Sequence, residues 1–294
     1  MISCCERGSE EDRTQKERVF WDYVFMLDKT CEDHSLVETV LLETELFIDA
    51  AFCKQGASSI VKLIKKLKVE KSCHAFTVTS ILSTRFLAMM IHPMARIVIQ
   101  KCFFFFGSQP NKILYEKVML HFDVLAIHEV GCRSLNDCIY TISGELRAWL
   151  LNKIADVSDY LSIHPYGNYV VQNVLSLKDS QVIAKILRCL RGQFIHLAQK
   201  KEGSRVVEKC MESCNLGTVF VVEEILHDHT APFLLAQDQF GNYVIQKALK
   251  KTMKPGFSHM YYALVRSLEP RCKELNLTKG GKNVIRLIEK PYSL

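Results

Sequence analysis

Apolar side chains recur along the chain at the spacing of one helix face. In the segment 144–161 leucine, isoleucine and valine residues stand at 146, 150, 151, 154 and 157, which would form one stripe on a helix. Segments 181–197 and 217–226 repeat this pattern. Each segment predicts an amphipathic helix, and together they predict an all-α fold.

A short motif led by glycine recurs between these segments. The clear copies are His-Glu-Val-Gly-Cys-Arg-Ser-Leu-Asn (128–136), His-Pro-Tyr-Gly-Asn-Tyr-Val-Val-Gln (164–172), Lys-Lys-Glu-Gly-Ser-Arg-Val-Val-Glu (200–208) and Asp-Gln-Phe-Gly-Asn-Tyr-Val-Ile-Gln (238–246). Weaker copies occupy 53–61 and 92–100, and a C-terminal copy occupies 277–286. We number the residue after the motif glycine, or its equivalent, as position one of each motif.

The position-one residues are evenly spaced. They are Ala57, Arg96, Cys132, Asn168, Ser204, Asn242 and Lys282, at steps of 39, 36, 36, 36, 38 and 40 residues. Apolar residues continue through each motif at helical spacing, so each repeat is predicted to be a pair of helices. A helix pair cannot bury its apolar face alone, and repeats of this length stack into a curved α-solenoid.

The first 50 residues differ from the rest. Helical patterns at 19–25 and 36–52 carry no glycine motif, and 13 acidic residues face only five basic ones. This segment has a net charge of −8, so residues 51–294 carry +14 in a chain of net +6. We expect residues 1–50 to form acidic degenerate or capping repeats. Residues 51–294 would form a basic array suited to phosphate contact.

Three positions of each motif could meet a nucleobase. On a helix, positions one and five lie on the same face, while position two points about 100° away. Two side chains could therefore share one base edge, and the third could reach between neighbouring bases. One such trio per repeat suits single-stranded RNA whose bases are splayed and stacked on side chains.

The trios resemble those of a known family. Asn-Tyr-x-x-Gln at 168–172 and 242–246, Ser-Arg-x-x-Glu at 204–208 and Cys-Arg-x-x-Asn at 132–136 are similar to Pumilio (PUF) repeats. The resemblance covers residues 53–294 and is strongest from 128 onward. The C-terminal copy resembles the half-repeat that closes the family's array, which makes the copy at 242 the last that contacts a base.

The resemblance implies a function. Pumilio proteins bind RNA antiparallel, so the repeat at 242 would take the 5′ base. It implies a sequence-specific regulator that binds the 3′ untranslated regions of mRNA, alters translation and mRNA stability, and recruits regulatory proteins. Such a protein would be a cytoplasmic monomer without catalytic activity, cofactor, metal or membrane segment.

The side chains themselves suggest base identities. Ionised Glu208 offers only acceptors, which suits the two donors on the Watson–Crick edge of guanine. Side-chain amides offer donors and acceptors, which suits uracil. With the implied polarity, the three C-terminal trios predict 5′-UGU. The candidate RNA-binding residues are Asn242, Tyr243, Gln246, Ser204, Arg205, Glu208, Asn168, Tyr169, Gln172, Cys132, Arg133, Asn136, Arg96, Ile97 and Gln100.

The trios weaken toward the N-terminus. Asn136 is one methylene shorter than the glutamine that the family uses for adenine, so the fourth base should be loosely selected, with A favoured. Arg96 and Ile97 replace the small or amide residue and the planar residue expected there, although Gln100 remains. The copy at 57–61 offers no side chain that could select a base.

The cysteines do not indicate disulfides or a zinc site. The twelve cysteines include no Cys-x-x-Cys pair, and no apolar leader or membrane-length run occurs, so we expect reduced intracellular thiols.

Three competing functions stay open. A nucleophilic role for Cys132 would make the chain an enzyme, but no hydrolase, nucleotide-binding or metal motif accompanies it. The chain could also be a non-specific Pumilio-like protein of ribosome assembly, or a helical-repeat scaffold that binds proteins.

Overall fold

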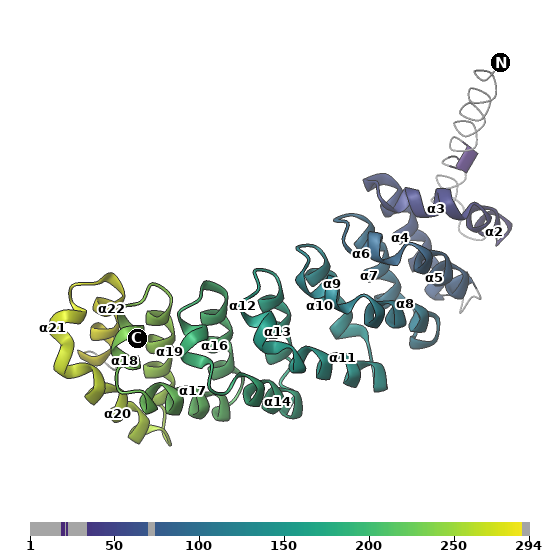
Figure 1. The fold of residues 1–294 in the computed structure, drawn as a ribbon. Coiled ribbons are helices and arrows are strands. Elements are labelled where there is room, and N and C mark those ends of the chain that lie inside the picture. The colour runs from purple at the N-terminus through teal and green to yellow at the C-terminus, as the bar shows by residue number, and fades with distance from the viewer. Residues whose placement is uncertain (1–18, 21, 23–33, 70–73, 290–294) are drawn as a thin grey trace, which may run out of the picture. The chain divides into compact units, whose positions relative to one another are not determined.

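The computed structural model describes residues 19, 20, 22, 34–69 and 74–289. The chain divides into two compact units, Met1–Arg147 and Ala148–Leu294. Every regular element in the described ranges is a helix, which confirms the all-α repeat fold (Figure 1). None of these helices combines the length and apolar character needed to cross a bilayer.

The first unit contains helices α2 to α10 and the start of α11. Their bounds are α2 His34–Leu42, α3 Thr44–Ala51, α4 Lys54–Val69, α5 His74–Thr84, α6 Phe86–Met90, α7 Ala95–Phe105, α8 Ser108–Leu120, α9 Phe122–Ile127, α10 Gly131–Thr141 and α11 Gly144–Asp156. The helix expected at 36–52 is divided at Glu43, whose backbone is not helical. Most of the helix expected at 19–25 lies outside the described residues.

The second unit contains the rest of α11 and all later helices. Their bounds are α12 Ser158–Ile163, α13 Gly167–Ser176, α14 Ser180–Leu190, α15 Phe194–Ala198, α16 Lys201–Ser213, α17 Asn215–His227, α18 Ala231–Gln237, α19 Gly241–Thr252, α20 Ser258–Leu268, α21 Cys272–Leu275 and α22 Lys279–Glu289. A 3-10 turn at Glu269–Arg271 precedes α21.

Each repeat has three helices, so the prediction of a helix pair is wrong. The segment 144–161 is divided at Val157, where φ is −112° and ψ is 20°. The segment 181–197 is divided at Gly192, whose φ of 84° lies in the left-handed region. A short helix therefore separates the long flanking helix of one repeat from the motif helix of the next.

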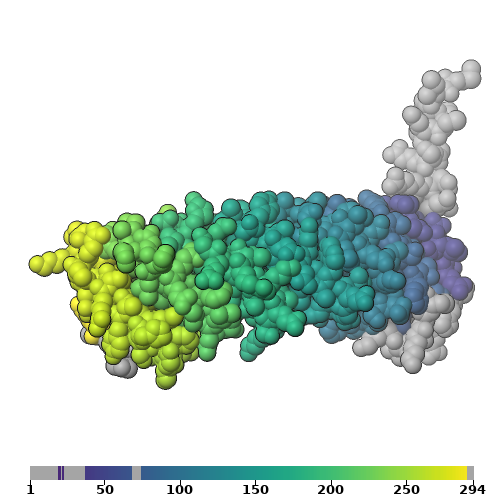
Figure 2. Space-filling model, turned by 60° about the horizontal axis from the view of Figure 1, so that its bottom comes forward, coloured from purple at the N-terminus to yellow at the C-terminus, as the bar shows by residue number. Residues whose placement is uncertain are grey.

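Helices of the same kind stack on one another within each unit. The motif helices are α4, α7 and α10 in the first unit and α13, α16, α19 and α22 in the second, and consecutive members pack together. In the second unit the flanking helices α14, α17 and α20 also contact in order. Repeats therefore follow one another in sequence order inside a unit, as the colours of Figure 2 show from green to yellow. The motif helices of a unit form one continuous layer.

The motif glycine permits close contact with the preceding short helix. A Cβ atom at Gly203 would lie 2.5 Å from the carbonyl oxygen of Leu197, and one at Gly241 would lie 2.9 Å from that of Leu235. These distances are shorter than any ordinary carbon–oxygen contact, so a larger residue would separate the two helices. The motif glycine therefore lets these motif helices pack directly against the short helix before them.

A side chain three residues before the motif glycine caps the motif helix. In α13 the His164 Nδ1 accepts hydrogen bonds from the backbone N–H groups of Tyr166 and Gly167, both at 3.2 Å. His92 and His128 do the same for α7 and α10. In α19 a carboxylate oxygen of Asp238 takes the place of the imidazole. These bonds satisfy N–H groups that have no partner inside the helix.

We predict that His164→Ala lowers the free energy of unfolding by about 1 kcal/mol, because two N–H groups at the start of α13 lose their acceptor. His164→Asp should retain most of the stability, since Asp238 performs this role in α19. Urea unfolding of both variants beside the unchanged chain measures the effect. Equal midpoints for all three proteins would refute the capping role.

Candidate nucleic-acid interface

The trios occupy equivalent places on four motif helices. Position one is buried in α10, α13, α16 and α19, with exposed fractions of 2% at Cys132, 1% at Asn168, 4% at Ser204 and 5% at Asn242. Position two is exposed in each, and position five is half-buried. Because α13, α16 and α19 pack side by side, their three trios belong to one layer of the second unit.

The buried asparagines hold the glutamines of the same trio. Asn168 Nδ2 donates to the carbonyl oxygens of His164 and Pro165, at 2.8 and 2.9 Å. Its Oδ1 accepts a hydrogen bond of 2.9 Å from Gln172 Nε2. Asn242 and Gln246 have the same geometry.

This arrangement differs from the expected equal role of both amides. The asparagine side chain folds back over the first turn of the helix, where carbonyl oxygens use both of its N–H groups. The glutamine is fixed in orientation and keeps its Oε1 and one Nε2 hydrogen for another group. In this structure the glutamine is therefore the polar end of the trio, and the asparagine positions it.

Glu208 is the corresponding residue of α16, and its surroundings oppose ionisation. Burial raises the pKa of its carboxyl group, while Lys247 and Arg205 act in the opposite direction. Beneath it, Ser204 Oγ donates to the carbonyl oxygen of Lys201 at 3.2 Å and leaves the carboxylate without a side-chain donor from its own trio. A ligand that donates hydrogen bonds would satisfy this half-buried group.

Two lysines at position six of neighbouring motifs lie near Glu208, which is at position five. Lys209 follows it on α16, and Lys247 occupies the same place on α19. Both ammonium groups face Glu212, with Lys209 Nζ 3.7 Å from a Glu212 oxygen and Lys247 Nζ at hydrogen-bond distance. Glu212 is one turn from Glu208 and has the opposite pKa shift, because the hydrogen bond from Lys247 lowers it.

The surface continues past the last trio onto α22. A hollow of about 280 Å³ adjoins Asn242 and Tyr243, and Thr278, Lys279 and Asn283 line its other side. Gly280 is close to Asn242 here, since a Cβ atom at this glycine would lie 2.9 Å from the asparagine Cβ. The C-terminal copy of the motif therefore borders the trio of α19.

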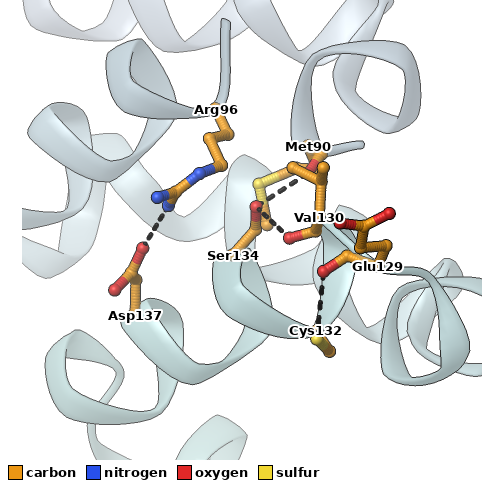
Figure 3. Close-up of polar contacts among 7 residues, drawn as sticks. All are labelled: Met90, Arg96, Glu129, Val130, Cys132, Ser134 and Asp137. Atoms are coloured by element: carbon orange, nitrogen blue, oxygen red, sulfur yellow. Dashed lines mark hydrogen bonds and ion pairs between the residues drawn. The ribbon is translucent and has the colours of Figure 1, made fainter. Parts of the chain in front are cut away.

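The trio of α10 gives no support to a catalytic cysteine. Cys132 Sγ donates to the carbonyl oxygen of Glu129 at 3.3 Å (Figure 3). Burial raises the pKa of this thiol, although Arg133 acts in the opposite direction. A nucleophilic thiol needs the reverse shift. Asn136 at position five is half-buried like its equivalents.

The trio of α7 departs most from the others. Arg96 is half-buried, and its Nη1 lies 2.7 Å from Asp137 Oδ2 on α10. Ile97 and Gln100 are also half-buried. The guanidinium group that sequence analysis placed among the RNA-binding residues is thus engaged with the neighbouring motif helix (Figure 3).

Two polar residues of α10 escaped the sequence analysis. Ser134 stands at position three, where α7, α13, α16, α19 and α22 have valine, and its hydroxyl lies 2.7 Å from the Met90 carbonyl oxygen. Asp137 stands at position six, where α7, α16 and α19 have lysine. An alignment of the motif copies at positions three and six would have shown that both residues differ from most of their equivalents.

Neither a metal site nor a disulfide occurs in the described ranges. No group of three or more His, Cys, Asp or Glu residues there could hold a metal ion. The eight cysteines that the structure describes are free thiols.

Comparison with known proteins gives a consistent result. The model of the "Pumilio-family RNA binding repeat" matches residues 85–119, 121–155, 160–188, 193–226 and 233–252. The chain is 32% identical to Pumilio homolog 18 of Arabidopsis thaliana over 92% of its own length and 81% of that protein. It is 35% identical to Pumilio homolog 9 of the same plant over 68% of its length, but over only 35% of that longer protein.

A solved structure shares the fold. The Puf4 RNA-binding domain, bound to the 3′ UTR recognition sequence of HO endonuclease RNA, aligns with a TM-score of 0.78 and 25% identity. The alignment covers 90% of this chain and 87% of that domain.

We predict opposite effects on stability from two substitutions one turn apart on α16. The folded-state pKa of Glu208 is raised, so ionised Glu208 destabilises the folded chain once the pH rises through that pKa. Glu208→Gln removes this ionisation and should therefore stabilise the chain near neutral pH. The pKa of Glu212 is lowered, so its contribution is present near neutral pH and lost in acid, and Glu212→Gln should destabilise the chain.

Thermal unfolding between about pH 3.5 and 7 tests this pair, because both glutamates are protonated in the unfolded chain at the lower end. The difference in unfolding temperature between each variant and the unchanged chain should shrink as the pH falls. If both substitutions change the unfolding temperature in the same direction at neutral pH, the proposed environments of the two carboxyl groups are contradicted.

Proposed function

Because the chain belongs to the Pumilio family of RNA-binding repeat proteins, which are not enzymes, we propose that it binds single-stranded RNA carrying 5′-UGU and a loosely selected fourth base. The observation that carries this proposal is the adjacent placement of three trios on α13, α16 and α19. We further propose that its targets are mRNA 3′ untranslated regions, as in the Puf4 complex, and that binding regulates translation or stability.

Glu208 would select guanine at the second base. An ionised carboxylate accepts two hydrogen bonds, and guanine presents two donors, N1–H and the exocyclic amine, on one edge. Burial already penalises the bare carboxylate, so donors from guanine would replace lost hydration. The Watson–Crick edges of uracil and cytosine each present only one donor group beside acceptors, so one carboxylate oxygen would be left unpaired.

Gln172 and Gln246 would select the two uracils. Each glutamine is held by a buried asparagine, which leaves Oε1 for the N3–H of uracil and one N–H for a uracil carbonyl. Pre-orientation lowers the entropic cost of ordering a long side chain on binding. Asn168 and Asn242 would thus act on base selection by orienting the glutamines.

The exposed residues at position two would stack on bases. Tyr169 and Tyr243 are 46% and 55% exposed, and Arg205 is exposed between them in the helix order. Planar side chains in adjacent repeats provide the spaced surfaces on which splayed bases stack. A protein-binding scaffold has no need of such spacing, which makes the RNA-binding function the better supported one.

The contacts weaken beyond the third base. Cys132 and Arg133 remain at positions one and two of α10, but the shorter Asn136 reaches less far than glutamine. We therefore expect a fourth base that favours A without requiring it. A non-specific mode, as in Pumilio-like proteins of ribosome assembly, would instead make the core sequence irrelevant.

We predict that the chain binds an RNA with a UGU core more tightly than one with an ACA core at the same salt concentration. Glu208→Gln should reduce the preference for guanine at the second base by about 1–3 kcal/mol, because one acceptor becomes a donor. Glu223→Gln, on the exposed face of α17, is the matched control. Gel-shift titrations measure both. Equal affinity for the two cores would support non-specific binding, and full guanine preference in Glu208→Gln would reject this base assignment.

We predict that Tyr169→Ala weakens binding to every RNA by about 1–3 kcal/mol, because stacking depends little on base identity. Tyr262→Ala removes a similarly exposed ring from flanking helix α20 and should leave binding unchanged. Fluorescence anisotropy with all four bases at the third position measures the effect. A loss confined to one base would show that Tyr169 contacts a base edge.

A further inference from the structure

We propose that Asp137 determines specificity by holding Arg96, so that the repeat of α7 does not select the fifth base. This inference rests on the proposed RNA-binding function. It concerns a contact between two repeats that departs from the pattern of the others.

The contact joins adjacent motif helices of the first unit. Arg96 Nη1 on α7 lies 2.7 Å from Asp137 Oδ2 on α10, and the two side chains are only 22% and 30% exposed (Figure 3). A second polar contact joins α10 to α6, the short helix before α7, because the hydroxyl of buried Ser134 donates to the Met90 carbonyl oxygen. The pair therefore forms within a defined packing of α7, α10 and α6.

Both residues are exceptions to the repeat, and they contact each other. Arg96 stands at position one, where α10, α13, α16 and α19 have buried small or amide side chains. Asp137 stands at position six, where Lys101, Lys209 and Lys247 are positively charged. The carboxylate of Asp137 would repel RNA phosphates if Arg96 did not neutralise it.

The ion pair changes what this surface offers to RNA. A free guanidinium at position one could donate two hydrogen bonds to O6 and N7 of guanine. Held by Asp137, it is turned toward α10 and its charge is balanced. Gln100 is then the remaining polar residue of this trio, without the asparagine that orients Gln172 and Gln246. The fifth base would meet no oriented group.

The test is a double-mutant cycle read out by base preference. Dissociation constants are measured at one salt concentration for short RNAs with a UGUA core and each of the four bases at the fifth position. The proteins are the unchanged chain, Asp137→Asn, Arg96→Gln and the double variant. The unchanged chain should bind the four RNAs within about twofold of one another, and Asp137→Asn should favour guanine by about five- to tenfold. The double variant should lose that preference.

The outcomes separate this inference from the proposed function. An ACA-core RNA is titrated against each protein, and if it binds as tightly as the UGU core, the proposed function fails and the inference with it. If the UGU core is preferred but Asp137→Asn leaves the fifth position unselective, only the role of Asp137 is overturned. A gain in affinity of Asp137→Asn that is equal for all four bases would also overturn it, because the loss of one negative charge explains such a gain without base selection. Thermal unfolding confirms that the variants are folded.

Discussion

The site depends on the close contact between each motif helix and the short helix before it. At Gly203 the space that a Cβ atom would need is occupied by the Leu197 carbonyl oxygen. This contact holds the motif helix against the short helix. In α7, α10, α13 and α19 the side chain three residues before the motif glycine, or before its equivalent Ala95, caps the motif helix. In α10, α13, α16 and α19, position one is buried, position two is exposed and position five is half-buried. The chemical groups that face the surface are therefore repeated by the packing of the backbone.

Burial gives the three positions different roles. The buried asparagines bond to carbonyl oxygens of their own first turn and orient the glutamines, whereas the tyrosines are exposed and would be available to stack on bases. Partial burial makes the Glu208 carboxylate costly in the free chain, although Lys247 and Arg205 oppose this effect, and a ligand with donors would satisfy it. The same burial that raises its pKa would sharpen base selection, since an unsatisfied carboxylate penalises the wrong base.

Much of this organisation could be predicted from sequence, because it depends on local periodicity. The steps of 36 residues predicted the repeat, and the family comparison confirms it. The breaks at Val157 and Gly192 were missed, since the apolar spacing continues across them. The burial of Asn168 and the Arg96–Asp137 pair were missed for another reason. Both depend on how one turn or one repeat packs against the next. The sequence of a single motif carries no information on that packing.

The central claim is that three adjacent trios select three successive bases. Selection from a random pool of RNA, followed by sequencing of the bound fraction, tests it most directly because no target is assumed. The account predicts enrichment of UGU, a weaker preference for A at the next base and no preference after it. Enrichment of an unrelated sequence, or of none, would contradict it.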